Sequence, residues 1–240
     1  MRSALARITP AGAKRLHERV LTRRFQRRSD AVNARVASEL SDLVVAGPFS
    51  GMRYPPGVGQ AGKLVGAYES ELHSAIASWI ASPPETIVDV GCGEGYYAVG
   101  LARTCPGSRI VAFDADERER GRCAAMASLN DVADRVRIEG ACGIAELQRF
   151  TEPGLALLLD CEGCEAELLD VEQVPAMRTW SMLVELHEFA RPGIAETLER
   201  RFAPTHHVEI IRERPRRRED HPELESEYTR EKILSIAHDH

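Results

Sequence analysis

Hydrophobic side chains recur at steps of three and four residues near the N-terminus, the spacing of a helix with one apolar face. The pattern covers residues 10–46 and consists of Leu16, Val20, Leu21, Phe25, Val32, Val36, Leu40 and Leu43. A second helix is predicted over about 67–81, ending before Pro83 and Pro84. The segment between them, residues 47–63, is rich in glycine and proline and is long enough to be a functional loop.

From residue 86 onward, short apolar runs alternate with helical stretches. The runs lie at about 86–91, 109–114, 135–139, 154–160, 181–187 and 207–212. Nearly continuous apolar runs of this length are typical of strands that are buried on both faces of a parallel sheet. Their alternation with helices predicts a doubly wound α/β fold with a mostly parallel, Rossmann-like sheet. We therefore expect a helical arm and substrate-covering loop over residues 1–66, and a Rossmann-like domain over residues 67–240.

Composition narrows the classes of function. The chain has 240 residues, a net charge of −6 and 5% aromatic residues, which disfavours a nucleic-acid platform. No apolar run approaches the roughly 20 residues that span a bilayer, and the N-terminus has no signal-peptide core, so the cytoplasm is the expected location. The pair Cys161 and Cys164 forms a lone C-x-x-C without further zinc ligands at a suitable spacing, so ordinary reduced thiols are expected.

The predicted N-terminal helix also carries a basic face. It is formed by Arg15, Arg19, Arg23 and Arg27, which recur at steps of four. Such a face is usually just exposed to solvent. Alternatively, it could bind an anionic substrate, RNA or a protein partner. The apolar face of the same helix offers a surface for a homo-oligomer.

Three glycines, Gly91, Gly93 and Gly95, lie at the first predicted strand-to-helix turn. Ligands of open α/β sheets bind beyond the carboxyl ends of the strands, and glycine lets a ligand approach the main chain. The G-x-G-x-G spacing differs from the G-x-G-x-x-G of dinucleotide enzymes, which disfavours a nicotinamide-dependent oxidoreductase. Asp114 ends the second apolar run, about 20 residues further on, where an acid can accept hydrogen bonds from ribose hydroxyls. Asp116 is better placed to cap the next helix.

The segments DVGCGEGYY, AFDAD, LLLDCEGCEAELLD and LVELHEF, in this order, resemble the class I S-adenosylmethionine (SAM)-dependent methyltransferases. More narrowly they resemble the FkbM-type family, with its D-x-G-x-x-x-G-Y-Y turn, D-x-E-G-x-E stretch and V-E-x-H strand. The resemblance covers roughly residues 60–190, including the upstream segment GKLVGAYESELHSAI. Cys92 and Gly93 stand where that family often has Ala-Asn, and Asp114 replaces its usual Glu; both changes keep the chemistry.

The resemblance implies SAM as the cofactor and oxygen as the methylated atom, on a small molecule such as a sugar or a secondary metabolite. The methionyl part would lie over Gly91–Gly95 with Asp89 near its ammonium group. The backbone around Ala141 and Cys142 would frame the adenine.

A second group of polar residues follows the fourth and fifth apolar runs. Asp160 and Glu162 end the fourth run, and Glu185 and His187 end the fifth. Residues two apart on a strand point the same way, and adjacent strand ends meet at one edge. We expect His187 to be a general base for the acceptor hydroxyl, with Glu185 fixing its orientation and Asp160 beside them. The alternative is a histidine with a purely structural role.

The expected substrate contacts are Glu162, together with Arg53 and Tyr54 from the predicted loop. Asp160, Glu162, Glu165, Glu185 and His187 offer donors for Mg²⁺, but no spacing is diagnostic and no metal site is predicted. A non-catalytic scaffold of the same fold is a further alternative. The complete set of glycines and acids argues against it, because a scaffold has no need of Asp114 at a strand end.

Overall fold

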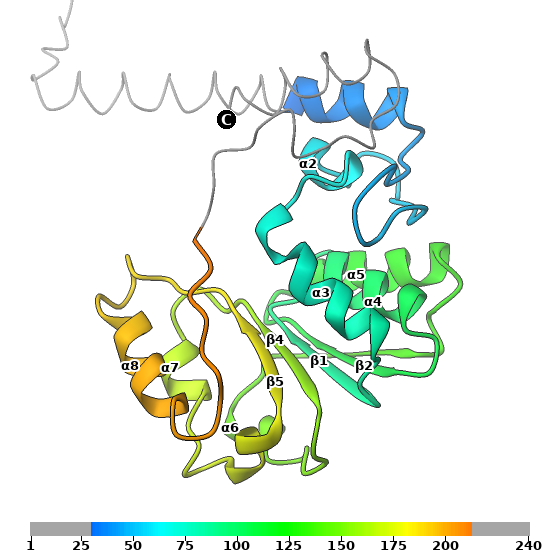
Figure 1. The fold of residues 1–240 in the computed structure, drawn as a ribbon. Coiled ribbons are helices and arrows are strands. Elements are labelled where there is room, and N and C mark those ends of the chain that lie inside the picture. The colour runs from blue at the N-terminus through cyan, green and yellow to red at the C-terminus, as the bar shows by residue number, and fades with distance from the viewer. Residues whose placement is uncertain (1–29, 213–240) are drawn as a thin grey trace, which may run out of the picture.

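The computed structural model describes residues 30–212, and their centre is a five-stranded, wholly parallel sheet (Figure 1). The strands lie in the order β3-β2-β1-β4-β5. They are β1 (Thr86–Val90), β2 (Arg109–Phe113), β3 (Val136–Glu139), β4 (Ala156–Leu159) and β5 (Ser181–Val184). The strand order reverses between β1 and β4, which is the point where ligands bind in doubly wound sheets.

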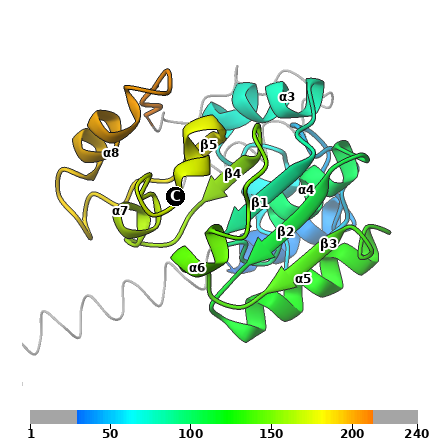
Figure 2. The ribbon, with the colours of Figure 1, turned by 90° about the horizontal axis from the view of Figure 1, so that it is seen from below.

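Helices cover both faces of this sheet (Figure 2). The helices between residues 30 and 212 are a helix over residues 30–39, α2 (Ala61–Leu64), η1 (Ser70–Leu72), α3 (His73–Ala81), α4 (Tyr96–Thr104), α5 (Glu117–Leu129), α6 (Ile144–Leu147), α7 (Glu165–Leu168), η2 (Pro175–Thr179) and α8 (Ile194–Phe202); the first two lie beyond the end of the sheet (Figure 1). Ile87 of β1 joins a core with α3, α4 and α5, whereas its neighbour Val88 joins a second core with α6, α7 and α8. Burial on both faces explains why the central strands β2, β1 and β4 appear in the sequence as continuous apolar runs.

Residues 36–67 pack into the first of these cores. Phe49 is fully buried and meets the rings of Tyr96 and Tyr97 edge-on, at centroid distances of 5.1 and 5.9 Å. A Cβ on Gly100 of α4 would lie 2.5 Å from the Phe49 ring, so the glycine is what lets this segment approach the helix. The described part of the predicted arm thus shares its core with the sheet. The division into 1–66 and 67–240 stays a prediction.

Two sequence expectations about the elements are wrong. The helix predicted over 10–46 ends at residue 39 in its described part, since Ser41 and Asp42 adopt left-handed backbone angles and residues 40–46 form turns and a bridge. The apolar run at 207–212 is not a strand, and Ile210 and Ile211 remain 45% and 36% exposed. Strand propensity without a packed neighbour does not make a strand. Residues 10–29, with the basic face of the predicted helix, lie outside the described residues.

None of the helices between residues 30 and 212 has the length and the apolar character that a membrane crossing requires.

Candidate functional site

The three glycines of the turn between β1 and α4 serve different purposes. Gly91 (φ +85°) is required by packing, since a Cβ there would lie 1.6 Å from the carbonyl oxygen of Asp160. Gly95 (φ +99°) is also required, because a Cβ would lie 2.9 Å from the sulfur of Cys123. A Cβ on Gly93 would meet no atom within 4 Å. Of the three, it is Gly93 that faces open space where a ligand can approach the main chain.

Asp114 directly follows β2 and faces Gly93. One carboxylate oxygen accepts a hydrogen bond from the Gly93 amide at 2.9 Å, and the other accepts from the Asp116 amide at 2.8 Å. Each oxygen retains a lone pair for a further donor, such as a ribose hydroxyl. Asp116 caps α5 through the Arg118 amide at 2.8 Å, as the sequence predicts.

Asp89, in β1, is the buried acid of this edge. Its side chain is 1% exposed, and neither carboxylate oxygen has a hydrogen-bond partner among the described residues. Burial is the largest cause that raises the pKa of Asp89 to about 7, and the negative charge of Asp160 is the second. The nearby Ala98 amide lowers the pKa and so offsets part of this rise, although it does not reach hydrogen-bond geometry. An unpartnered buried carboxylate is costly. Its position therefore suits a cationic group supplied by a ligand.

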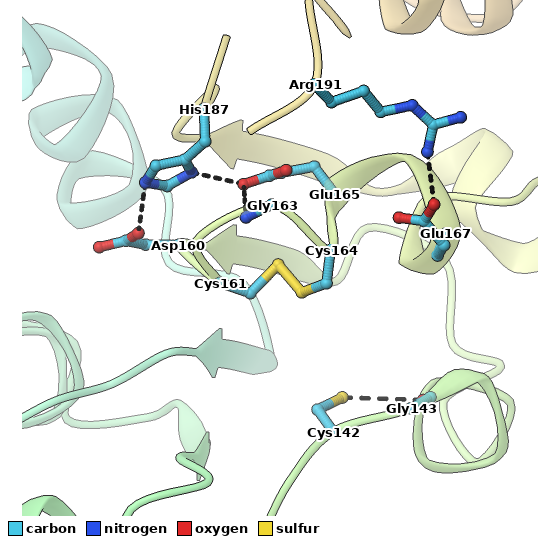
Figure 3. Close-up of a disulfide and its surroundings, with 10 residues drawn as sticks. All are labelled: Cys142, Gly143, Asp160, Cys161, Gly163, Cys164, Glu165, Glu167, His187 and Arg191. Atoms are coloured by element: carbon cyan, nitrogen blue, oxygen red, sulfur yellow. Dashed lines mark hydrogen bonds and ion pairs between the residues drawn. A yellow bond between two sulfur atoms is a disulfide. The ribbon is translucent and has the colours of Figure 1, made fainter. Parts of the chain in front are cut away.

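Ala141 and Cys142 lie just beyond β3. Ala141 is exposed, whereas Cys142 is half-buried against the second core, with its sulfur 3.8 Å from the carbonyl oxygen of Gly143 (Figure 3). Burial raises the pKa of the Cys142 thiol to about 12, so the group is unreactive at neutral pH. Their assignment to the adenine stays a prediction.

His187 is the centre of the second cluster, which lies where β4 and β5 end (Figure 3). Its Nδ1 lies 2.5 Å from an oxygen of Glu165, the first residue of α7. Its Nε2 lies 3.6 Å from a carboxylate oxygen of Asp160 and 3.9 Å from one of Glu185. The oxygen of Glu165 that holds His187 also accepts the Gly163 amide at 3.0 Å. The ring is thus fixed through Nδ1, and Nε2 faces the carboxylates of the strand ends.

The orienting role expected for Glu185 falls to Glu165. Glu185 is exposed and beyond hydrogen-bond distance of the ring, whereas Glu165 is fully buried. The sequence did hold a signal for this residue, since Glu165 is the last acid of the D-x-E-G-x-E stretch. The signal does not reveal which ring nitrogen the acid contacts.

The charges of the cluster shift several pKa values. Burial lowers the pKa of His187, but the hydrogen bond and charge of Glu165, with the charges of Glu185 and Asp160, outweigh it and raise the pKa overall. Burial and the charge of Asp160 raise the pKa of Glu185 to about 7. Burial also raises the pKa of Asp160. The pKa of Glu185 thus lies near neutral pH, and the pKa values of His187 and Asp160 are both raised above their usual values.

The same cluster has the donor set of a metal site. One donor atom each from Asp160, Glu185 and His187 lies within 4.8 Å of the others. Two oxygens and one imidazole nitrogen suit a divalent cation such as Mn²⁺ better than Mg²⁺, which prefers oxygen alone. A metal there would occupy the nitrogen that a general base needs, so the two roles exclude each other.

Two of the three expected substrate residues do not face this cluster. Tyr54 is 2% exposed, and its hydroxyl donates to Glu94 at 3.2 Å; Lys63 pairs with the same Glu94 oxygen at 2.5 Å. Arg53 is exposed, but its amide donates to Asn130 at the end of α5, which is the opposite edge of the sheet. The predicted loop is thus largely packed against α4. Glu162, exposed and directly beyond Asp160, does lie at the strand ends.

Residues 68 and 69, which sequence reasoning did not select, lie close to the cluster. Burial raises the pKa of Tyr68, and the charge and hydrogen bond of Glu69 and the charges of Glu185 and Asp160 raise it further. The Tyr97 hydroxyl donates to Glu69. Tyr68 and Glu69 are therefore near enough to the carboxylates of the cluster to interact with them electrostatically. Both residues belong to the upstream segment GKLVGAYES, which is the sequence feature that could have pointed to them.

The pair Cys161 and Cys164, expected as reduced thiols, forms a disulfide between Asp160 and Glu165 (Figure 3). Periodicity cannot show this, because the oxidation state depends on how the chain brings the two sulfurs together.

No protein-family model and no curated protein matches the chain. Several solved structures resemble it weakly. A methyltransferase from Geobacter sulfurreducens is 19% identical, with a TM-score of 0.36, over 45% of this chain and 56% of its own. An O-methyltransferase from Bacillus cereus in complex with SAH is 17% identical, with a TM-score of 0.38, over 45% of this chain and 52% of its own. An O-methyltransferase family protein from Burkholderia thailandensis is 12% identical, with a TM-score of 0.32, over 57% of this chain and 45% of its own. The chain thus matches about half the length of each.

Proposed function

We propose that the chain is a SAM-dependent methyltransferase that methylates a hydroxyl of a small molecule. One observation carries the proposal: an open glycine turn with Asp114 and the unpartnered Asp89 shares a sheet edge with a histidine oriented by a buried glutamate. The first part suits a cofactor that has a ribose and a cation, and the second suits removal of a proton.

The residues at the turn fit SAM. Asp114 would accept the ribose hydroxyls, Asp89 would face the cationic methionyl part, and Gly93 would allow contact with the main chain. When bound, SAM supplies the methyl group from its sulfonium. Since neither Asp89 oxygen has a hydrogen-bond partner between residues 30 and 212, a cationic ligand would relieve the cost of burying the carboxylate.

His187 would take the proton of the acceptor hydroxyl at Nε2, while Glu165 holds Nδ1 and stabilises the imidazolium that results. Only the neutral ring can act as a base. Because the pKa of His187 is raised above its usual 6.5, activity should increase with pH through an apparent pKa above 6.5. Substituting Glu165→Gln should move that apparent pKa to lower pH.

The motif resemblance supports the narrower assignment to the FkbM-type family. Three acids and the histidine of its D-x-E-G-x-E and V-E-x-H stretches are Asp160, Glu162, Glu165 and His187, and the structure brings Asp160 and Glu165 to the histidine. This narrower assignment, the cytoplasmic location and a homo-oligomer remain predictions.

The experiment is a calorimetric titration with SAM, S-adenosylhomocysteine and NADH in parallel, followed by methyl transfer from labelled SAM to a panel of hydroxyl compounds. The proposal expects binding of the first two ligands, no binding of NADH, and label on an acceptor oxygen. Binding of NADH alone would overturn the proposal.

Two further assays separate the alternatives. If EDTA abolishes transfer and Mn²⁺ or Mg²⁺ restores it, the cluster is a metal site and His187 is a ligand. An RNA-binding protein that uses its arginines would lose affinity steeply between low and moderate salt, whereas the proposed small-molecule enzyme would not.

A further inference from the structure

The disulfide Cys161–Cys164 closes a small ring directly between two residues of the histidine cluster (Figure 3). Asp160 precedes the ring and Glu165 follows it. Inside the ring, Glu162 and Gly163 both have left-handed backbone angles, with φ of +50° and +113°. A non-glycine residue rarely adopts this conformation unless its surroundings hold it there. The cross-link keeps this short segment closed.

The ring contacts two neighbours of His187, the Glu165 side chain and Ala190. The Gly163 amide donates to the oxygen of Glu165 that also holds Nδ1 of His187, at 3.0 and 2.5 Å. On the other side, a Cβ on Gly163 would lie 2.9 Å from the Cβ of Ala190, three residues beyond His187. The position of Gly163 is therefore coupled both to the carboxylate that orients the base and to the loop that carries it.

Of the six cysteines, three are partly exposed, and two of these form the disulfide. Both are partly exposed, whereas Cys92, Cys105 and Cys123 are buried. Cys142 is partly exposed too, but burial raises the pKa of its thiol to about 12, which leaves almost no reactive thiolate. A ring of four residues constrains the unfolded chain less than a long loop, so the cross-link acts mainly on local geometry.

We infer that Cys161 and Cys164 are a redox-active pair whose oxidation state controls how Glu165 holds His187. In the oxidised state the ring places the Gly163 amide and the Glu165 carboxylate against the imidazole. A dithiol reductant attacks one sulfur, the S–S bond breaks, and a mixed disulfide forms. The second thiol of the reductant then displaces the protein sulfur. The protein gains two electrons and two protons, and the reductant becomes a cyclic disulfide. The opened segment releases Glu162 and Gly163 and weakens the Glu165–His187 contact.

The effect on turnover rests on the proposed function, but the effect on His187 does not. The test is therefore an NMR pH titration of the histidine ring protons, with His187 assigned by its absence in His187→Gln. It compares oxidised protein, protein in dithiothreitol, and the variant Cys161→Ser/Cys164→Ser. We expect the pKa of His187 to fall towards about 6.5 in the reduced protein and in the double variant, since the bond to the Glu165 carboxylate weakens.

Two controls accompany the titration. Cys142→Ser removes a nearby sulfur outside the ring and should retain the full response to dithiothreitol, whereas the double variant should show none. Thiol counting adds an independent measure: six cysteines with one disulfide leave four reactive thiols after unfolding without reductant, and six with it.

The inference is overturned if the pKa of His187 is the same in oxidised and reduced protein, or if air-oxidised protein shows six thiols after unfolding. If the double variant does not fold, the comparison of wild-type protein with and without dithiothreitol still decides. A protein that binds no SAM would refute the proposed function while the His187 titration remains a valid test of the pair.

Discussion

The glycine turn after β1 and the histidine cluster after β4 and β5 lie at the same edge of the sheet, yet their carboxylates are held differently. Asp114 is held by the backbone amides of Gly93 and Asp116, close to the turn itself. Glu165 is held by the side chain of His187, which follows β5, and by the Gly163 amide. The turn therefore depends on backbone amides at the ends of β1 and β2, whereas the cluster depends on a side-chain contact between α7 and the segment after β5. Substitutions in the two regions should consequently affect binding and turnover separately.

The largest expected effect is on turnover, from His187→Gln. Loss of the base should lower the rate of methyl transfer by roughly 10²–10⁴-fold, while affinity for SAM stays within about twofold because the turn is untouched. Steady-state assays and calorimetry on the same preparation measure both. His207→Gln, an exposed histidine, is the matched control and should keep full activity. Loss of SAM affinity in His187→Gln would show that the two regions are not independent.

The next effect distinguishes two glycines of the same turn. Gly91→Ala should prevent folding, since its Cβ would lie 1.6 Å from a backbone oxygen of Asp160. Gly93→Ala has open space and should fold with a loss of roughly 1–2 kcal/mol for its left-handed backbone, but its methyl group should reduce affinity for SAM. Urea unfolding measures the stability of each variant, and calorimetry measures its affinity for SAM. Equal SAM affinity of wild-type and Gly93→Ala protein would mean that no ligand approaches the main chain there.

A smaller effect concerns the stability of the ligand-free protein at Asp89. The unfolded chain loses this proton near pH 3.8, whereas the folded chain holds it up to about pH 7. The folded state thus binds more protons between these values, and stability falls as the pH increases from about 4 to 7. Because one pKa unit corresponds to about 1.4 kcal/mol, Asp89→Asn should be more stable than wild type by roughly 2–4 kcal/mol at pH 8, and little different at pH 4.

Urea midpoints at the two pH values measure the Asp89 effect, with Asp116→Asn as a control that should show no such pH dependence. A destabilised Asp89→Asn protein at pH 8 would indicate that the carboxylate already has a partner in the folded chain.

The sequence could predict features that follow from a short pattern along the chain, but not those that depend on which distant segments pack together. The first five strands were found from their apolar runs: the central strands β2, β1 and β4 are buried along nearly their whole length, and the edge strands β3 and β5 only in part. The glycine turn and Asp114 followed from spacing alone. The helix end at residue 39 and the missing strand at 207–212 were not found, since periodicity does not show which neighbours a segment has.

In the cluster, the sequence identified His187 and Asp160 but assigned the orienting role to Glu185. The nearer residue along the chain was chosen, whereas the fold brings Glu165 from the start of α7 to Nδ1. Tyr54 was expected at the substrate from its place in a glycine-rich segment, and it is instead buried beneath Glu94. Side-chain partners from distant segments depend on packing that a single sequence does not encode in any short pattern.

The most direct test of the account is the affinity of the Asp114→Ala protein for SAM, measured by calorimetry beside wild type and Asp116→Ala. Asp116 caps α5, so its loss should cost about 1 kcal/mol of stability and leave affinity unchanged. Asp114→Ala removes one or two charge-assisted hydrogen bonds to the ribose and should weaken binding at least about tenfold. Unchanged affinity in a folded Asp114→Ala protein, or no binding of SAM to wild type, would contradict the assignment of this edge as a SAM site.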